Sequence, residues 1–344
     1  MKACEGADYV VVADTGSTDG TAEKLRELGA TVYDISIKPW RFDDARNAAL
    51  ALVPADADVC VVLDLDEVPQ PGFFDKVRKG WKKDATFGWI TMDTGQTWQR
   101  DRLHTRHGYH WKYPCHEIQI YYGNEPIKAV NVLDAVIKHE PDSSKSRSQY
   151  LTVLQLAVKE YPDDPRMWTY MCREYYFHQK WQDVIDAGKR QLELNGWDVE
   201  SAAVCRWVGE SYHQLGDEDN ARFYYDKGVE ILPREGESHY GVAIDAYRKN
   251  EWQRCLDASM AVMELPRSIH YCYEADVWDW KAFDLAGVSA YNLGHVEEAL
   301  TFAKEAAKAN GPEQERILRN IDFMEKILNE RMPTRQQDKR MGTK

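Results

Sequence analysis

The residues VCVVLDLDE at positions 59–67 decide the fold of the first half of this 344-residue chain. The five apolar residues 59–63 predict a buried strand. Asp64 and Asp66 follow it, and because alternate residues of a strand point to the same side, their carboxylates are expected to converge. Two close carboxylates repel each other, and a divalent cation relieves that repulsion. The alternative interpretation is a solvated turn rich in aspartate.

Short apolar strands alternate with helical segments up to about residue 147. We expect strands at residues 9–13, 31–35, 59–63 and 87–92, and helices at residues 21–28 and 43–53. This alternation predicts a mainly parallel sheet covered on both faces. Ligands of such sheets bind beyond the carboxyl ends of the strands, and both Asp14 and Asp64 are expected at that edge.

The second half of the chain is helical and repeats itself. The sequence YFHQKWQDVIDA at residues 176–187 returns as YRKNEWQRCLDA at residues 247–258, two periods of about 35 residues later. Small residues such as Gly209, Gly228 and Gly287 stand where paired helices would touch. Over residues 165–311 this pattern resembles tetratricopeptide repeats, with an insertion expected near residues 267–278. We interpret the repeat aromatics as core residues.

Charge and composition exclude several classes of function. The net charge of −13 argues against attraction to nucleic acid or an anionic membrane surface. No apolar stretch has the length of a transmembrane helix, and the first residues lack an apolar signal region. The seven cysteines form no CxxC pair, so we expect free thiols in a reducing cytoplasm.

A second strong signal is the sequence VVVADTGSTDGT at residues 10–21. A strand ends at Asp14, and Ser17, Thr18 and Asp19 can each cap the helix that follows. A plain strand-to-helix turn would look the same. The string nevertheless closely resembles the nucleotide-binding turn of family 2 glycosyltransferases of the GT-A fold. That resemblance implies that Asp14 contacts the nucleobase or ribose of a donor.

Other segments resemble the same family in the same order. WRFDDARNAAL at residues 40–50 is similar to its Phe-x-x-Ala-Arg-Asn segment, which implies that Arg46 and Asn47 line the donor site. Without that resemblance, Arg46 is as well explained as an exposed arginine of an amphipathic helix. Asp64 and Asp66 stand at the place of the family's Asp-x-Asp metal motif.

The resemblance extends to the end of the first half. WKYPCHE at residues 111–117 looks like the His-Glu segment near the acceptor site. His139 resembles the histidine of a late strand that approaches the metal or diphosphate, and Lys145 and Arg147 follow as basic residues. For His139, a buried histidine at a domain boundary is the alternative.

The resemblance implies an α/β GT-A (Rossmann-like) domain at residues 1–147 and an all-α tetratricopeptide-repeat solenoid at residues 148–330. The polar residues 331–344 are expected to form a disordered tail. The family normally has a strand and a helix before the strand that ends at Asp14. Only eight residues precede Tyr9, so we expect the usual first strand to be missing from the sheet.

The resemblance implies an inverting, metal-dependent glycosyltransferase, with Asp64, Asp66 and His139 as ligands of Mn²⁺ or Mg²⁺. The donor would be a nucleotide-sugar, with a UDP-sugar as first choice, and Arg46, Lys145 and Arg147 would stabilise its diphosphate.

Glu117 is the first candidate for the general base, Asp93 the second, and His116 would orient the base or bind the acceptor. A salt-bridged strand residue is the alternative for Glu117. The acceptor would be a glycan or a protein, and the repeats would bind a protein partner or form a homo-oligomer. An inactive binding scaffold and a nucleotidyltransferase are the competing hypotheses.

Overall fold

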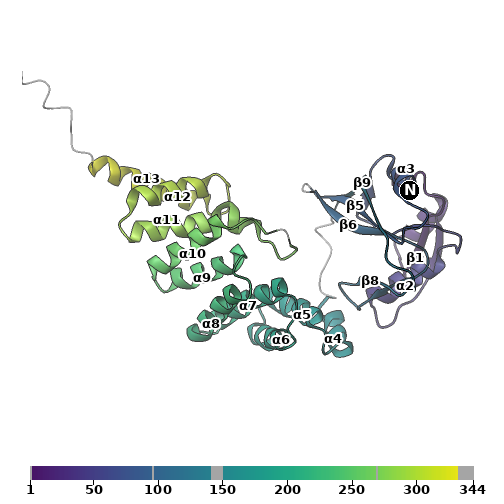
Figure 1. The fold of residues 1–344 in the computed structure, drawn as a ribbon, viewed down its shortest axis with the longest axis horizontal. Coiled ribbons are helices and arrows are strands. Elements are labelled where there is room, and N and C mark those ends of the chain that lie inside the picture. The colour runs from purple at the N-terminus through teal and green to yellow at the C-terminus, as the bar shows by residue number, and fades with distance from the viewer. Residues whose placement is uncertain (1, 95–96, 141–149, 269, 332–344) are drawn as a thin grey trace, which may run out of the picture. The chain divides into compact units, whose positions relative to one another are not determined.

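The computed structural model describes residues 2–94, 97–140, 150–268 and 270–331, and it divides into two compact units, Met1–Glu160 and Tyr161–Lys344 (Figure 1). The predicted boundary between residues 147 and 148 lies outside the described residues, and so do residues 332–344 of the predicted tail. Within the described part of the chain, no helix combines the length and apolar character that crossing a membrane requires.

A five-stranded mixed sheet with the strand order β3-β6-β5-β9-β4 organises the first unit. Its strands are β3 (Cys60–Val61), β4 (Glu67–Pro69), β5 (Phe87–Asp93), β6 (Thr97–His104) and β9 (Ala129–His139). Only the β5–β9 pair is parallel, so the prediction of a mainly parallel sheet is wrong. The reason lies in the connections, because a short link such as the one between β5 and β6 joins only antiparallel neighbours.

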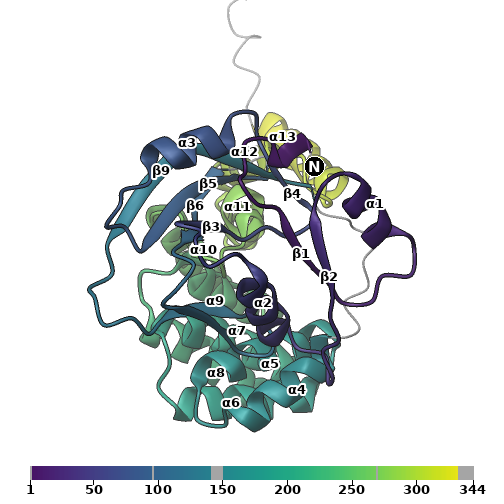
Figure 2. The same cartoon turned by 90° about the vertical axis from the view of Figure 1, so that its right-hand side faces the viewer.

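A separate two-stranded parallel sheet precedes it, made of β1 (Val11–Asp14) and β2 (Thr31–Asp34) with α1 (Thr21–Glu27) between them (Figure 2). Among the described residues no strand joins β1 to β3. Asp14 and Asp64 therefore follow strands of two different sheets. In the described part of the chain, the hydrogen-bond ladder is therefore interrupted between the two sheets.

The core of the first unit lies between the five-stranded sheet and α3 (Phe73–Gly80). Alternate residues of β5 are buried, and Ile90 and Met92 pack there with Ile137 of β9 and Phe73 of α3. Helix α3 covers β9 in both views (Figures 1 and 2). Backbone pairing holds β4 against β9 at one edge of the sheet.

The remaining elements of the first unit surround these sheets. They are η1 (Lys2–Cys4), α2 (Phe42–Leu52), the hairpin of β7 (Tyr109–Lys112) and β8 (Ile118–Tyr121), and α4 (Tyr150–Glu160). Helix α2 contacts both β1 and β7. It therefore connects the small parallel sheet to the hairpin.

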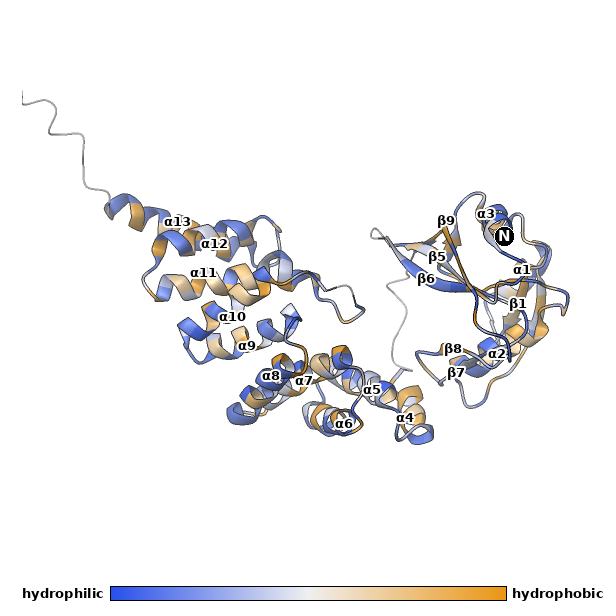
Figure 3. Ribbon diagram, viewed as in Figure 1, coloured by the Kyte–Doolittle hydropathy of each residue, from blue (hydrophilic) through white to orange (hydrophobic). Residues whose placement is uncertain are grey.

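The second unit is a series of antiparallel helix pairs, α5–α6, α7–α8, α9–α10 and α11–α12, followed by α13. The elements are α5 (Pro165–Phe177), α6 (Trp181–Glu193), α7 (Asp198–Gln214), α8 (Glu218–Ile231), α9 (Gly236–Arg248), α10 (Trp252–Glu264), η2 (Val277–Lys281), α11 (Ala282–Asn292), α12 (Val296–Ala307) and α13 (Gln314–Arg331). The predicted insertion lies between α10 and α11. Each helix presents both hydrophilic and hydrophobic residues, as its role in a layered array requires (Figure 3).

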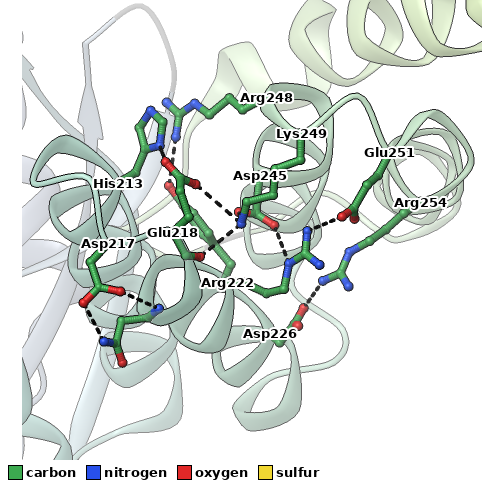
Figure 4. A network of polar contacts seen from close by, with 12 residues as sticks. His213, Asp217, Glu218, Arg222, Asp226, Asp245, Arg248, Lys249, Glu251 and Arg254 are labelled. Atoms are coloured by element: carbon green, nitrogen blue, oxygen red, sulfur yellow. Dashed lines mark hydrogen bonds and ion pairs between the residues drawn. The ribbon is translucent and has the colours of Figure 1, made fainter.

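Charged side chains join neighbouring helix pairs on one side of this array (Figure 4). Arg222 of α8 donates to Asp245 of α9 at 3.1 Å and to Glu251 before α10 at 2.6 Å. Lys249 also donates to Asp245, at 2.6 Å. Asp245 is only 2% exposed, so its two cationic partners compensate the cost of burying its charge. The network thus fixes α8 against the following pair.

Candidate functional site

Arg46 of α2 connects three segments that are distant in the sequence. Its Nε donates to Oε1 of Glu117 at 2.5 Å, and its Nη2 donates to Oδ1 of Asp64 at 2.8 Å. The guanidinium lies 4.9 Å from the centre of the Trp111 ring, where the ring face attracts its charge. Three residues that the sequence suggested separately are therefore in direct contact.

Asp64 has a second basic neighbour, Arg102 of β6, whose Nη2 lies 3.6 Å from Oδ2 of Asp64. Burial raises the pKa of Asp64, while Arg46 and Arg102 lower it, and the arginines prevail. The carboxylate is therefore held in its charged form. Both oxygens of Asp64 face guanidinium groups in this structure.

Glu67 and Arg102 form a buried ion pair beneath Asp64 that the sequence analysis missed. The other carboxylate oxygen of Glu67 accepts a hydrogen bond from the backbone N–H of Asp64 at 3.0 Å. This bond fixes the turn between β3 and β4. Glu67 is the last residue of the acidic string in the sequence. No local pattern indicates Arg102, which contacts Glu67 only because β6 pairs with β3.

The five charged residues Glu117, Arg46, Asp64, Arg102 and Glu67 form a chain in which carboxylates and guanidiniums alternate. Within it, burial lowers the pKa of Arg46, but Asp64 and Glu117 raise it by more, so the guanidinium stays charged. We call this set the charged cluster. Its residues come from α2, the β3–β4 turn, the start of β4, β6 and the segment before β8.

Asp66 and His139 are also brought together. Oδ2 of Asp66 lies 3.7 Å from Nε2 of His139, because β4 and β9 pair Glu67 with His139. The backbone N–H of Glu140 donates to the Asp66 carbonyl at 2.8 Å. The two side chains are 22% and 33% exposed, so a ligand can reach them. A carboxylate and an imidazole are suitable ligands for a first-row divalent ion such as Mn²⁺.

Asp14 shapes its own turn. Its Oδ2 accepts hydrogen bonds from the backbone N–H groups of Gly16 and Ser17, at 3.0 and 2.9 Å. Hydrogen bonding with Ser17 lowers the pKa of Asp14, so the carboxylate stays charged although it is buried. The N-cap of α1 is Gly20, without a side-chain cap, so the prediction that Ser17, Thr18 or Asp19 caps this helix is wrong, although Asp19 accepts from the N–H of Thr21 at 3.0 Å. The plain strand-to-helix turn accounts for these bonds.

Asn47 and the segment before Glu117 position the site. The Asn47 amide donates to the carbonyl of Trp111 at 2.8 Å and accepts from its N–H at 2.7 Å, which ties α2 to β7. Tyr113 and His116 have φ values of 85° and 53°, conformations that cost energy for residues other than glycine. His116 directly precedes Glu117, and Tyr113 stands four residues before it.

The second candidate base lies elsewhere. Asp93 ends β5 and pairs with Lys138 of β9, and β9 separates β5 from β4. Asp93 is therefore two strand spacings, about 10 Å, from the backbone of β4. Glu117 belongs to the charged cluster, and Asp93 does not. The predicted donor-site residues Lys145 and Arg147 lie outside the described residues.

A comparison with known proteins finds a family match within the first unit. Residues 4–133 match the family model described as glycosyl transferase family 2. No curated protein matches the chain. The matched range includes every charged-cluster residue and Asp66, and ends shortly before His139.

Solved structures resemble the helical array. YrrB, described as a tetratricopeptide repeat protein with an unusual peptide-binding site, is 16% identical, and the match covers 50% of this chain and 81% of that one with a TM-score of 0.38. MamA from Desulfovibrio magneticus RS-1 is 14% identical over 48% of this chain and 85% of that one, with a TM-score of 0.39. The repeat assignment depends on the helix pairs and their sequence period. The first unit is a glycosyl transferase family 2 domain, and an array of tetratricopeptide-like helix pairs follows it.

Proposed function

We propose that this protein is an inverting, metal-dependent glycosyltransferase that moves a sugar from a nucleotide-sugar, with a UDP-sugar as first choice, to an acceptor hydroxyl. The observation that carries the proposal is the contact of Arg46 with both Asp64 and Glu117. The guanidinium of Arg46, a group suited to binding phosphate, thereby connects the candidate base Glu117 to Asp64 of the acidic motif. The family match supports the transferase class.

On the donor side, Asp66 and His139 would hold Mn²⁺ or Mg²⁺, with Asp64 as the further candidate ligand. The ion would neutralise the negative charge that develops on the diphosphate leaving group. Arg46 presents a planar guanidinium, which matches phosphate oxygens well. Arg102 and Glu67 act below the surface, because they fix the backbone of the turn that carries both aspartates.

On the acceptor side, Glu117 would take the proton of the attacking hydroxyl. Its side chain is 11% exposed, so little water competes for the carboxylate. Arg46 fixes its position at 2.5 Å and would shift toward the diphosphate when a donor binds. A positioned base contributes about 10²–10⁴-fold to the rate. Asp93 remains the second candidate, and His116 would orient the base or the acceptor.

The competing proposal is a binding scaffold without catalytic activity. The separation of β1 from the five-stranded sheet favours it, because Asp14 and Asp64 follow strands of different sheets. Retention of both acidic motifs, with Asp64 in contact with Arg46, favours the transferase. In either case the helix pairs would bind a protein or glycan partner or a second copy of the chain. The free thiols of the described residues support a reducing cytoplasm.

Isothermal titration with Mn²⁺ and a panel of nucleoside diphosphates tests the donor site. We expect one nucleotide to bind in the presence of metal, and Asp66→Ala to remove that binding while the circular dichroism spectrum stays unchanged. Asp134→Asn, an exposed change on β9, is the matched control and should bind normally. Equal binding by both variants would contradict the metal assignment.

Glu117→Gln separates the two proposals. If the protein is a transferase, this variant keeps nucleotide binding but loses about 10²–10⁴-fold in turnover of the nucleotide-sugar, measured as released nucleoside diphosphate. Release of pyrophosphate instead would indicate a nucleotidyltransferase. Tight nucleotide binding without turnover of any nucleotide-sugar by the wild type would favour the scaffold.

A further inference from the structure

Glu235, Glu237 and His270 form a second polar cluster, in the helical unit. One ligand atom from each residue lies within 4.8 Å of the others. Glu235 and Glu237 stand at the start of α9, and His270 belongs to the segment between α10 and η2. The two glutamates are 1% and 0% exposed. Ionised carboxylates buried this deeply need compensating partners.

The hydrogen bonds of the cluster leave one glutamate oxygen without a donor. Oε2 of Glu235 accepts from Arg206 at 2.9 Å and also from the hydroxyl of Ser238. Oε1 of Glu235 is buried and has no hydrogen-bond partner among the described residues. It lies 3.4 Å from Nε2 of His270, in a contact that does not have hydrogen-bond geometry. Nδ1 of His270 is likewise buried without a partner in the described part of the chain.

Charge and spacing both suit a dication at this place. Three carboxylates, those of Glu235, Glu237 and Glu274, lie around the guanidinium of Arg206, and against this one cation they carry an excess of two negative charges. In a tetrahedral site with ligands about 2.0–2.1 Å from the metal, neighbouring ligand atoms are about 3.3 Å apart. The 3.4 Å between Glu235 and His270 matches that separation.

We propose that Glu235, Glu237 and His270 bind one first-row divalent cation of the Zn²⁺ class. Imidazole selects such ions over Mg²⁺ and Ca²⁺, and the two carboxylates complete a set of three protein ligands. The ion would attach the inserted segment to the start of α9. This role is structural, and it is independent of the Asp66 site in the first unit.

The hydrogen bonds around Glu237 already prepare this arrangement. Its Oε2 accepts from the hydroxyl of Ser268 at 2.7 Å, and its Oε1 accepts from the backbone N–H of Glu274 at 3.2 Å. Both donors belong to the inserted segment that carries His270. They orient the carboxylate in the way that outer partners orient metal ligands.

The test uses the full chain without an affinity tag, stripped with chelator and titrated with Zn²⁺ by calorimetry and with Co²⁺ by absorption. We expect one saturable site that persists in Asp66→Asn. His270→Ala should weaken it by at least about tenfold, and its Co²⁺ spectrum should lose the imidazole-dependent bands. This variant keeps the Arg206–Glu235 pair, so it should fold. His239→Ala, a change at a half-buried residue of α9 whose imidazole contacts the Pro233 carbonyl, is the control and should bind like the wild type.

Proteolysis gives a second readout. Zn²⁺ should slow tryptic cleavage after Arg267, which lies in the inserted segment, in the wild type and in His239→Ala but not in His270→Ala. Two results would overturn the proposal. One is the absence of a saturable site in Asp66→Asn, which would leave an ordinary ion pair between His270 and Glu235. The other is equal affinity of the His270→Ala and His239→Ala proteins.

Discussion

Arg102 and Glu67 form an ion pair in which each side chain is only 4% exposed. Removing one member of such a pair leaves the other charge buried without compensation. We therefore expect Arg102→Met to lower the free energy of unfolding by about 3–5 kcal/mol, measured by urea denaturation. The double variant Arg102→Met/Glu67→Gln should recover part of that loss, because the amide oxygen can still accept from the N–H of Asp64.

Arg78→Met is the control for this pair. Arg78 is 53% exposed and pairs with exposed aspartates on the surface of the same unit. Exposed pairs contribute about 0–1 kcal/mol, so this change should be nearly neutral. A similar cost for Arg78→Met and Arg102→Met would show that the buried pair has no special role.

Arg46 and Glu117 should be energetically coupled. A double-mutant cycle with Arg46→Met and Glu117→Gln is expected to give an interaction free energy of about 1–3 kcal/mol, because the two side chains are in direct contact at 2.5 Å. Arg46→Lys should restore little of it, since an ammonium group does not present the fork that reaches Glu117 and Asp64 together. The control cycle pairs Arg46→Met with Asp134→Asn and should be additive. Additivity in both cycles would contradict the contact.

The sequence predicted which residues belong to the candidate site better than it predicted which of them are in contact. The strings around Asp14, Arg46, Asp64 and Glu117 are local, and each is recognisable because its backbone pattern and its chemistry occur in consecutive residues. The contact of Arg46 with Glu117 depends on how α2 packs against β7. Arg102 is harder still to predict, because it reaches Glu67 only after β3 has paired with β6, which brings the β3–β4 turn beside Arg102.

The fold shows the same limit. The helix pairs were predictable because the period of about 35 residues is written in the sequence itself. The four predicted strands of the first unit end within two residues of β1, β2, β3 and β5, but the other strands were not predicted one by one, and among the described residues only the pairs β1–β2 and β5–β9 are parallel. Strand direction depends on long-range pairing, and alternating strands and helices are compatible with both parallel and mixed sheets.

The contribution of Asp64 to stability should depend on pH. Burial raises the pKa of Asp64, whereas Arg46 and Arg102 lower it. The net result is a pKa below the ordinary value of 3.8. A lowered pKa in the folded state means that the stabilisation is fully present above the ordinary value and is lost as the pH falls through the folded value. The difference in thermal midpoint between wild type and Asp64→Asn should therefore be constant from about pH 7 to pH 5 and shrink below about pH 4. A difference that grows on acidification would contradict this assignment.

Two glycines of the helical unit should respond in opposite ways to alanine. A Cβ on Gly188 of α6 would lie 2.3 Å from Cγ2 of Val208, a buried and stiff side chain of α7, so Gly188→Ala forces the helices apart. The Cβ of Gly228→Ala would meet nothing closer than 3.4 Å, and this change gains the higher helix propensity of alanine. We expect Gly188→Ala to destabilise the protein by about 1–3 kcal/mol and Gly228→Ala to stabilise it by about 0.5–1 kcal/mol. Thermal unfolding of the two variants measures both effects, and a stabilising Gly188→Ala would show that α6 and α7 are not packed as closely as the structure describes.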